Sequence, residues 1–207
     1  MIVNTYYTGP LGTNTYLAYD ETKKAFIVDP GGYSDALVND VNGKGLTAEY
    51  ILLTHGHVDH IGGVSYFRET WPMIKVVACE KEKELLGNPH LNSSFEFTGT
   101  AVTANADIYV NDGDTMTIGN MKLSFLHTPG HTGGGMCIVS DGVVFSGDTL
   151  FRGSVGRTDF YGGSMTELIA SIKNKLFVLP DDTTVYPGHM QQTTIGFEKR
   201  YNPFVRI

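Results

Sequence analysis

Four short apolar runs in the sequence end directly at a histidine or an aspartate. The runs are "ILLTH", ending at His55, "SFLHTPGH", ending at His131, "VVFSGD", ending at Asp148, and "TVYPGH", ending at His189. Each run is typical of a strand. Because binding sites are often built on loops at one edge of a strand scaffold, we expect these strands to deliver the four side chains to one place.

The order of the expected elements predicts an α/β protein with two sheets packed face to face and helices outside. Residues 2–28 predict an antiparallel meander, and later strands form a second cluster. Residues 80–87 predict a helix with exposed charges, and residues 88–104 a long surface loop. Further helices are expected over residues 34–45, 58–72, 164–180 and 192–202. In the third of these, we expect one apolar face formed by Met165, Leu168, Ile169, Ile172 and Leu176.

Charge and hydropathy exclude several classes of partner. The formal net charge of −7 argues against nucleic acid. No stretch approaches the roughly 20 apolar residues of a membrane span. The first residues lack a basic segment followed by an apolar run, so no signal peptide is expected. We therefore expect a cytoplasmic protein that uses neither nucleic acid nor a membrane.

The segment "THGHVDH" adds further candidate ligands to the first strand end. It contains His55, His57, Asp59 and His60 within six positions. Histidine and carboxylate ligands suit zinc, iron or manganese. This spacing, added to three other strand ends that carry histidine or aspartate, predicts a metal site.

Seven candidate ligands exceed the need of one tetrahedral ion, so we expect two divalent ions. His55, His57 and His131 supply one trio. The other trio is Asp59, His60 and His189, and the two oxygens of Asp148 allow it to bridge. Paired ions lie ~3.5–4 Å apart and share a water whose pKa they lower. Zinc is the first expectation for both ions, with iron or manganese as alternatives.

Some of these residues have simpler interpretations. Asp59 could serve only as the N-cap of the helix that carries His60. His127 is expected to pack behind the site rather than to bind metal, and His90 is expected to face solvent. Cys137 is expected to be a small buried residue, and Cys79 has no basic neighbour that would make it a nucleophile.

The motifs "THGHVDH", "HTPGHTGG", "FSGDTLF" and "VYPGH" resemble those of the metallo-β-lactamase-fold hydrolases, over essentially the whole chain. The resemblance implies an αββα sandwich, in which two mixed sheets pack face to face with helices on both outer faces. It implies a dinuclear site at the sheet edges and the same seven ligand roles. A single domain over residues 1–207 is expected, with the oligomeric state left open.

The presence of Asp148 narrows the expected substrate. True β-lactamases of this fold resemble one another in lacking that aspartate, so the chain looks like the glyoxalase II branch, which hydrolyses hydroxyacylglutathione thioesters. The segment "GDTLFRGSVGRTDFYGGS" resembles its glutathione-binding loop, which implies that Arg157 and Tyr161 bind substrate. The alternatives are a salt bridge of Arg157 with Asp159 and rim packing of Tyr161.

The resemblance also implies a mechanism. Asp59 and Asp148 are the expected catalytic residues, and a hydroxide between the ions attacks the thioester carbonyl. Long glyoxalase II enzymes carry a C-terminal helical domain that binds glutathione. We expect none in this chain, so whether glutathione is the thiol stays open.

Two other functions remain open. "VGRTDF" also resembles the persulfide dioxygenases of this fold, which hold one iron at positions matching His55, His57, His131 and Asp148. The complete second set of ligands favours two ions instead. A non-enzymatic binding scaffold would be expected to have lost ligands, and none of the seven is missing.

Overall fold

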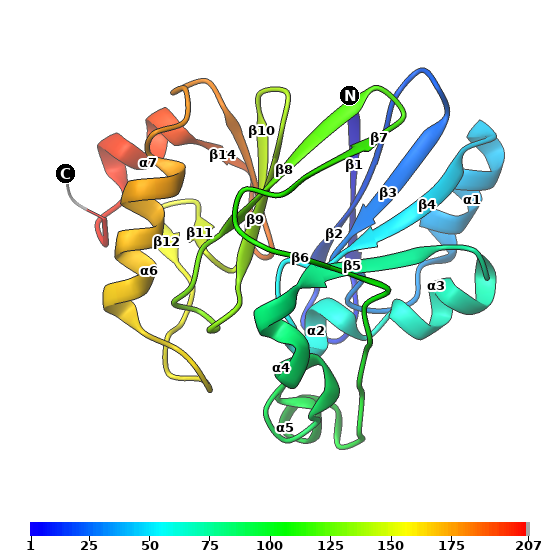
Figure 1. The fold of residues 1–207 in the computed structure, drawn as a ribbon, viewed down its shortest axis with the longest axis horizontal. Coiled ribbons are helices and arrows are strands. Elements are labelled where there is room, and N and C mark those ends of the chain that lie inside the picture. The colour runs from blue at the N-terminus through cyan, green and yellow to red at the C-terminus, as the bar shows by residue number, and fades with distance from the viewer. Residues whose placement is uncertain (206–207) are drawn as a thin grey trace.

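The computed structural model describes residues 1–205. Two six-stranded sheets pack face to face, and helices cover both outer faces (Figure 1). This arrangement confirms the expected α/β class and the αββα sandwich. The prediction of a single domain over residues 1–207 stays a prediction.

The first sheet begins with the expected antiparallel meander and continues with parallel strands. Its strands, in spatial order, are β1 (Ile2–Thr8), β2 (Thr13–Tyr19), β3 (Lys24–Val28), β4 (Thr47–Leu52), β5 (Lys75–Cys79) and β6 (Ile108–Val110). Parallel pairing needs crossover connections, and all three of them in this sheet contain helices. Helix α1 (Asp35–Lys44) connects β3 to β4, and helices α2 (Val58–Ile61) and α3 (Val64–Thr70) connect β4 to β5. Helices α4 (Lys83–Gly87) and α5 (Ser94–Thr98) lie between β5 and β6.

The second sheet is mostly antiparallel, with one parallel pair between β10 and β13. Its strands, in spatial order, are β14 (Thr193–Thr194), β13 (Thr184–Pro187), β10 (Val143–Gly147), β9 (Met136–Ser140), β8 (Met121–His127) and β7 (Thr115–Ile118). A small hairpin of β11 (Leu150–Phe151) and β12 (Ser154–Val155) follows β10. The sequence did not predict this hairpin.

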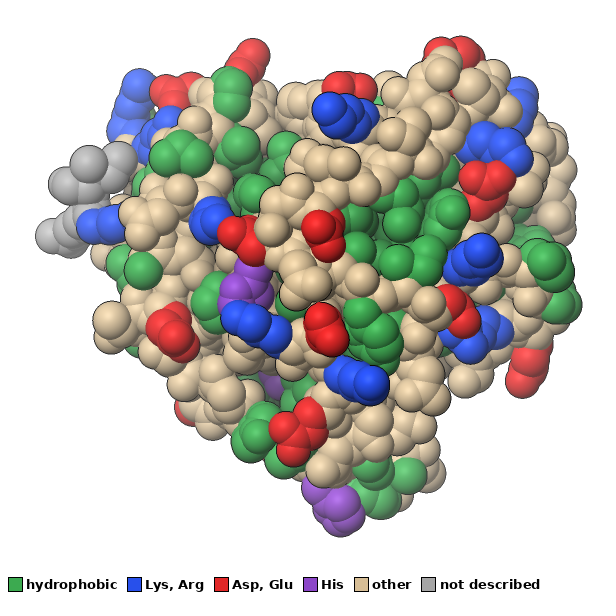
Figure 2. Space-filling view, in the orientation of Figure 1, with side chains coloured by type: hydrophobic (Ala, Val, Ile, Leu, Met, Phe, Trp, Pro, Cys, Tyr) green, Lys and Arg blue, Asp and Glu red, His purple; other side chains and the backbone are tan. Residues whose placement is uncertain are grey.

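Side chains alternate across each strand, and this alternation divides the core into three layers. Phe26 and Leu52 of the first sheet pack against Phe145 of the second in the central layer. Ile27 and Ile51, which are next to Phe26 and Leu52 in their strands, face the helices of the first sheet. Figure 2 shows apolar side chains reaching the surface along the seam between the two sheets.

The helices begin in different ways, and within residues 1–205 three of them start at a capping serine or threonine. Their bounds are α1 (Asp35–Lys44), α2 (Val58–Ile61), α3 (Val64–Thr70), α4 (Lys83–Gly87), α5 (Ser94–Thr98), α6 (Met165–Ser171) and α7 (Ile195–Tyr201), with a 3-10 turn η1 (Glu80–Glu82) and a π-helical turn η2 (Ile172–Leu176). Helix α1 starts at Ser34, whose side chain accepts a hydrogen bond from the amide of Leu37. It ends at Gly45, which has a φ of 63°. No helix within residues 1–205 is long and apolar enough to cross a membrane.

The helix expected over residues 58–72 is wrong as a single element, because it is broken into α2 and α3. Gly62 and Gly63 lie at the break and pack directly against the turn before α1. A Cβ atom at Gly63 would lie 2.4 Å from the carbonyl oxygen of Gly32. The amide of Gly63 donates to the carbonyl of Pro30 instead of continuing the helix.

Three other expectations need correction. The charges of residues 80–87 are not all exposed, because Glu82 is only 1% exposed. Residues 88–104 contain helix α5 and the buried Asn92, so they are not a simple surface loop. Met165 is 43% exposed, because helix α6 presents Leu168 to the core and leaves its first residue in solvent.

Candidate metal centre

The seven predicted ligands converge at one edge of the sandwich, where strands of both sheets end. Three groups have ligand atoms within 4.8 Å of one another: His55, His57 and His131; His55, His60 and Asp148; and Asp59, His60 and His189. We call the first group the histidine trio and the third group the aspartate trio. Both trios are the sets that we expected from the sequence. They form because the strand ends that carry their residues meet at this edge.

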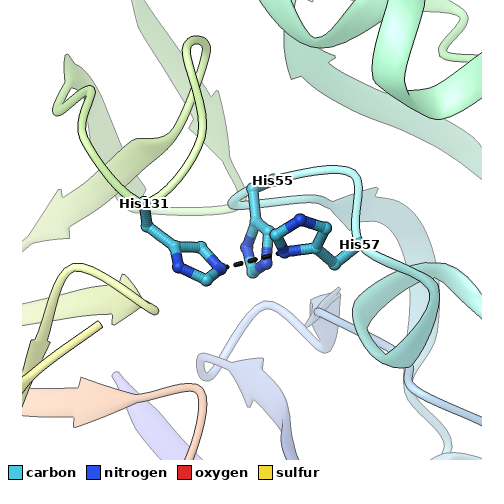
Figure 3. A group of neighbouring side chains, drawn as sticks. All are labelled: His55, His57 and His131. Atoms are coloured by element: carbon cyan, nitrogen blue, oxygen red, sulfur yellow. Dashed lines mark hydrogen bonds between the residues drawn. The ribbon is translucent and has the colours of Figure 1, made fainter. Parts of the chain in front are cut away.

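The histidine trio joins the two sheets. His55 and His57 follow β4 of the first sheet, whereas His131 follows β8 of the second, and the three rings point toward one another (Figure 3). The Nδ1 atom of His57 lies 2.9 Å from the Nε2 atom of His131. A tetrahedral ion with bonds of about 2.0–2.1 Å places its ligand nitrogens about 3.3 Å apart. The spacing of the two rings is therefore close to what one shared ion requires.

The aspartate trio lies beside the histidine trio. The Nε2 atom of His189 is 3.0 Å from Oδ2 of Asp59, and Nε2 of His60 is 3.5 Å from the same oxygen. His60 is fully buried. Asp59 is buried and lies inside helix α2, whose N-cap is His57, so the N-cap alternative for Asp59 is wrong.

Asp148 lies between the two trios. Its Oδ1 atom is 3.4 Å from Nε2 of His60, and its Oδ2 atom is 3.6 Å from Nε2 of His131 and 3.7 Å from Nε2 of His189. One carboxylate thus reaches members of both trios. This is the position that a bridging ligand needs.

Contacts behind the rings orient three of the histidines. Nδ1 of His60 is 2.9 Å from a carboxylate oxygen of Asp29, and Nδ1 of His131 is 2.7 Å from the carbonyl oxygen of Arg157. Because these oxygens can only accept, both Nδ1 atoms carry the proton. Nδ1 of His55 lies 3.1 Å from the hydroxyl of Thr54. Such contacts leave the Nε2 lone pairs free for a metal.

The chemistry of these donors fits metal ions. The Nε2 atoms of His55 and His60 and the Oδ1 atom of Asp148 are buried and lack a hydrogen-bond partner among residues 1–205. Buried polar atoms without partners are costly, and natural proteins rarely keep several together. An ion bound by these atoms would remove the cost.

Burial and charge shift the pKa values of two histidines in each trio, downward in the histidine trio and upward in the aspartate trio. Burial, reinforced by His60 and His131, holds the pKa of His55 well below its usual value. Burial and the neighbouring His131 lower the pKa of His57 to about 3. Burial also opposes protonation of His60, but the carboxylates of Asp59 and Asp148 outweigh it and raise the pKa of His60. The pKa of His189 is likewise raised, because its hydrogen bond to Asp59 outweighs burial.

A family model described as the metallo-beta-lactamase superfamily matches residues 8–189 of this chain. The chain belongs to that superfamily. Membership and the cluster of histidines and aspartates together support divalent metal binding and, at the level of the superfamily, a metal-dependent hydrolase.

Known superfamily members are similar to this chain over most of its length. The hydroxyacylglutathione hydrolase GloC of Haemophilus influenzae is 35% identical, and the alignment covers 93% of this chain and 92% of that protein. The crystal structure of BLEG-1, a B3 metallo-beta-lactamase, is 43% identical with a TM-score of 0.93, covering 99% of both chains. The crystal structure of ETHE1 from Myxococcus xanthus is 33% identical with a TM-score of 0.83, covering 99% of this chain and 84% of that one.

In the present chain, a cavity of about 500 Å³ opens onto the metal centre. Its floor includes His57, Asp59, His131, Asp148 and His189. Apolar side chains form most of the rest of its lining: Leu11, Phe97, Phe151, Val155, Phe160 and Met190. The cavity is therefore suited to a small substrate with apolar parts.

The two predicted substrate-binding residues are placed differently. Arg157 lines the cavity, but its guanidinium makes two hydrogen bonds to Asp159, of 3.0 and 2.7 Å, and lies 4.4 Å from the centroid of the Phe160 ring. Tyr161 lies outside the cavity lining, and its hydroxyl donates to Glu84. The geometry matches the salt-bridge alternative for Arg157 and gives no support to substrate binding by Tyr161.

The remaining histidines lie outside both trios. The Nε2 atom of His127 is 3.0 Å from the carbonyl oxygen of Gly133, so this ring braces the loop that carries His131. His90 is exposed and packs on Phe95, with ring centroids 4.8 Å apart. Neither histidine belongs to a group of candidate metal ligands within residues 1–205.

Sequence reasoning missed several residues that hold the ligands in place. Asp29 directly follows strand β3 and bonds both His60 and Thr54. Its place after an apolar strand matches the other strand-end ligands, so the same signal could have found it. The hydroxyl of Thr13 donates to Asp59 over 3.1 Å. The side-chain amide of Asn14 donates to the carbonyl oxygens on either side of His189, at Pro187 and Met190.

Proposed function

We propose that this chain hydrolyses a thioester of the hydroxyacylglutathione type with the help of two divalent ions. The position of Asp148 carries the proposal, because its two oxygens face members of both trios. The similarity to GloC, described as a hydroxyacylglutathione hydrolase, supports this class of substrate. Zinc is the first expectation for the ions, and iron or manganese would suit the same ligands.

The candidate ligands would form two separate metal sites that share one carboxylate. The histidine trio would hold one ion and the aspartate trio the other, with Asp148 between them. When bound, such a pair supplies a Lewis acid and lowers the pKa of a shared water toward neutrality. Asp59 accepts a hydrogen bond from Thr13, which fixes its carboxylate on the floor of the cavity.

The cavity would bind the acyl and thiol parts of the substrate. Hydrolysis adds water across the carbon–sulfur bond and yields a carboxylic acid and a thiol. The apolar walls formed by Phe97, Phe151 and Phe160 would exclude bulk water from the ester. For Arg157 to bind a carboxylate of glutathione, it would have to exchange its bonds to Asp159 for the substrate.

A persulfide dioxygenase is the second candidate. The similarity to ETHE1 supports it, because the resemblance of this chain to the dioxygenases implies one iron on the histidine trio and Asp148. The two candidates differ in the use of the aspartate trio. A hydrolase with two ions needs that trio, whereas a dioxygenase with one iron does not.

One set of assays separates the candidates. We would determine metal content per chain and then measure hydrolysis of a hydroxyacylglutathione, oxygen uptake with glutathione persulfide, and hydrolysis of a β-lactam. The last assay is included because of the similarity to BLEG-1. Two ions with thioester hydrolysis and no oxygen uptake support the proposal. One iron with oxygen uptake would overturn it in favour of the dioxygenase.

The variant Asp148→Ala provides the structural test of the proposal. It should lose at least one ion and most of the thioester hydrolysis, because it removes the carboxylate between the trios. A variant that kept both ions and full activity would contradict the proposed bridging role.

A further inference from the structure

Glu82 is a buried carboxylate close to the centre that has no assigned role. It lies in the turn η1 after strand β5 and is 1% exposed. Burying a carboxylate is expensive unless hydrogen bonds compensate for the lost water. All of its partners within residues 1–205 belong to the two loops that carry the histidine trio.

Each oxygen of Glu82 serves a different loop. Oε2 accepts a 2.7 Å hydrogen bond from the amide of Gly56, which lies between His55 and His57. Oε1 accepts from the hydroxyl of Thr132 over 2.7 Å and from the amide of Gly134 over 2.8 Å, directly after His131. One carboxylate therefore joins a loop of the first sheet to a loop of the second.

We infer that Glu82 is a positioning residue for the ion held by the histidine trio. It sets the separation between the loop of His57 and the loop of His131, whose rings must share one ion. The inference rests on the proposed metal centre. It goes beyond that proposal by assigning one residue to only one of the two ions.

The aspartate trio has its own supports, which makes the inference selective. Asp29 bonds His60, and Thr13 bonds Asp59. Asn14 holds the segment that carries His189. None of these contacts involves Glu82. The main chain also links the two sheets here, through hydrogen bonds from the amide of Met136 to the carbonyl of Thr54 and from the amide of Asn14 to the carbonyl of Gly188.

The test compares Glu82→Gln with the wild-type protein by metal titration against a chromophoric chelator. Zinc and cobalt are the probes, and the variants His131→Ala and His189→Ala identify which affinity belongs to which trio. Glutamine keeps the size of the side chain but presents an amide to three donors. We expect the ion of the histidine trio to bind about 10–100-fold more weakly, with the other affinity unchanged. The visible spectrum of cobalt in the histidine trio should change as well.

Glu198→Gln is the matched control. Glu198 is also fully buried and accepts from three donors, Gly153, Thr193 and Asn202. It contacts neither loop of the histidine trio. We expect it to lose thermal stability while keeping both metal affinities. If Glu82→Gln behaves like this control, or if it weakens both ions equally, the inference is overturned.

A milder variant covers the case in which Glu82→Gln does not fold. Thr132→Val removes one of the three donors and keeps the shape of the side chain. It should weaken the same ion about fivefold, the value of one ordinary hydrogen bond. Unchanged affinity in Thr132→Val would then count against the inference. These readouts do not depend on hydrolysis, so a chain that binds metal but cleaves no thioester would overturn only the proposed function.

Discussion

The two trios of the centre contain the same kind of ring in opposite electrostatic surroundings. His55 and His57 are buried mainly among other histidines, and burial lowers their pKa values. His60 and His189 are also buried, but the carboxylates beside them raise their pKa values. The comparison shows that burial alone does not decide the charge of a histidine, because a neighbouring carboxylate can reverse its effect.

The largest effect should come from removing one ligand of each trio in turn. His131→Ala and His189→Ala should each lower thioester hydrolysis by about 10³-fold or more, since each ion supplies several kcal/mol to the reaction. Metal content and initial rates measure this. If His189→Ala keeps its iron and takes up oxygen with a persulfide, the two trios are not equal partners and the dioxygenase is favoured.

A smaller effect should follow from weakening the support of the aspartate trio. Asp29→Asn removes the carboxylate behind His60, so it should lower both the pKa of His60 and its hold on the metal. We expect the affinity at the aspartate trio to fall about 10–100-fold in a chelator titration. The histidine trio should lose less, because Asp29 reaches His55 only through Thr54. Equal losses of metal affinity at both trios would show that Asp29 does not support the aspartate trio selectively.

Acid should release the two ions in a fixed order. As pH falls through and below the raised pKa values of His60 and His189, protons compete with the ion of the aspartate trio. His57, with a pKa of about 3, stays neutral down to a much lower pH. Each displaced proton should weaken binding about tenfold per pH unit. Metal retention after dialysis at stepped pH tests the order, and earlier loss from the histidine trio would contradict it.

The smallest effect should appear at the rim of the cavity. Asp159→Asn frees the Arg157 guanidinium from an exposed ion pair, an interaction that solvent screens and that therefore contributes little. KM for a glutathione thioester should therefore fall by up to about fivefold, with kcat unchanged. The metal content should not change, because His131 is held by the main chain of Arg157 rather than its side chain. An unchanged KM would indicate that Arg157 does not bind substrate.

The sequence predicted the sandwich and the residues that line its edge, because both are recorded in local patterns. Alternating apolar runs specify strands, and each of four runs ends at a candidate ligand. Ser34 and Gly45 marked the ends of α1 in the same way. Such signals depend on neighbours along the chain and can be recognised without a structure.

Most of the features that could not be predicted depend on contacts between distant segments. Glu82 lies within a run of charges, and nothing in that run distinguishes the one that is buried between two loops. Gly63 breaks a helix because the turn at Gly32 presses against it. The pairing of Arg157 with Asp159 was one of two alternatives that the sequence could not separate. The first two features are determined by contacts with residues elsewhere in the fold. The third is determined by the geometry of the loop that carries Arg157 and Asp159.

The histidine trio draws its rings from both sheets, and this has a consequence for how the chain folds. Neither sheet alone offers a complete set of ligands, so the binding energy of an ion is available only after the two halves of the sandwich have docked. An ion at 100 times its dissociation constant would add about 2.7 kcal/mol to that docked state. The bound ion would thus stabilise the docked state of the two sheets, so that they would unfold as one cooperative unit.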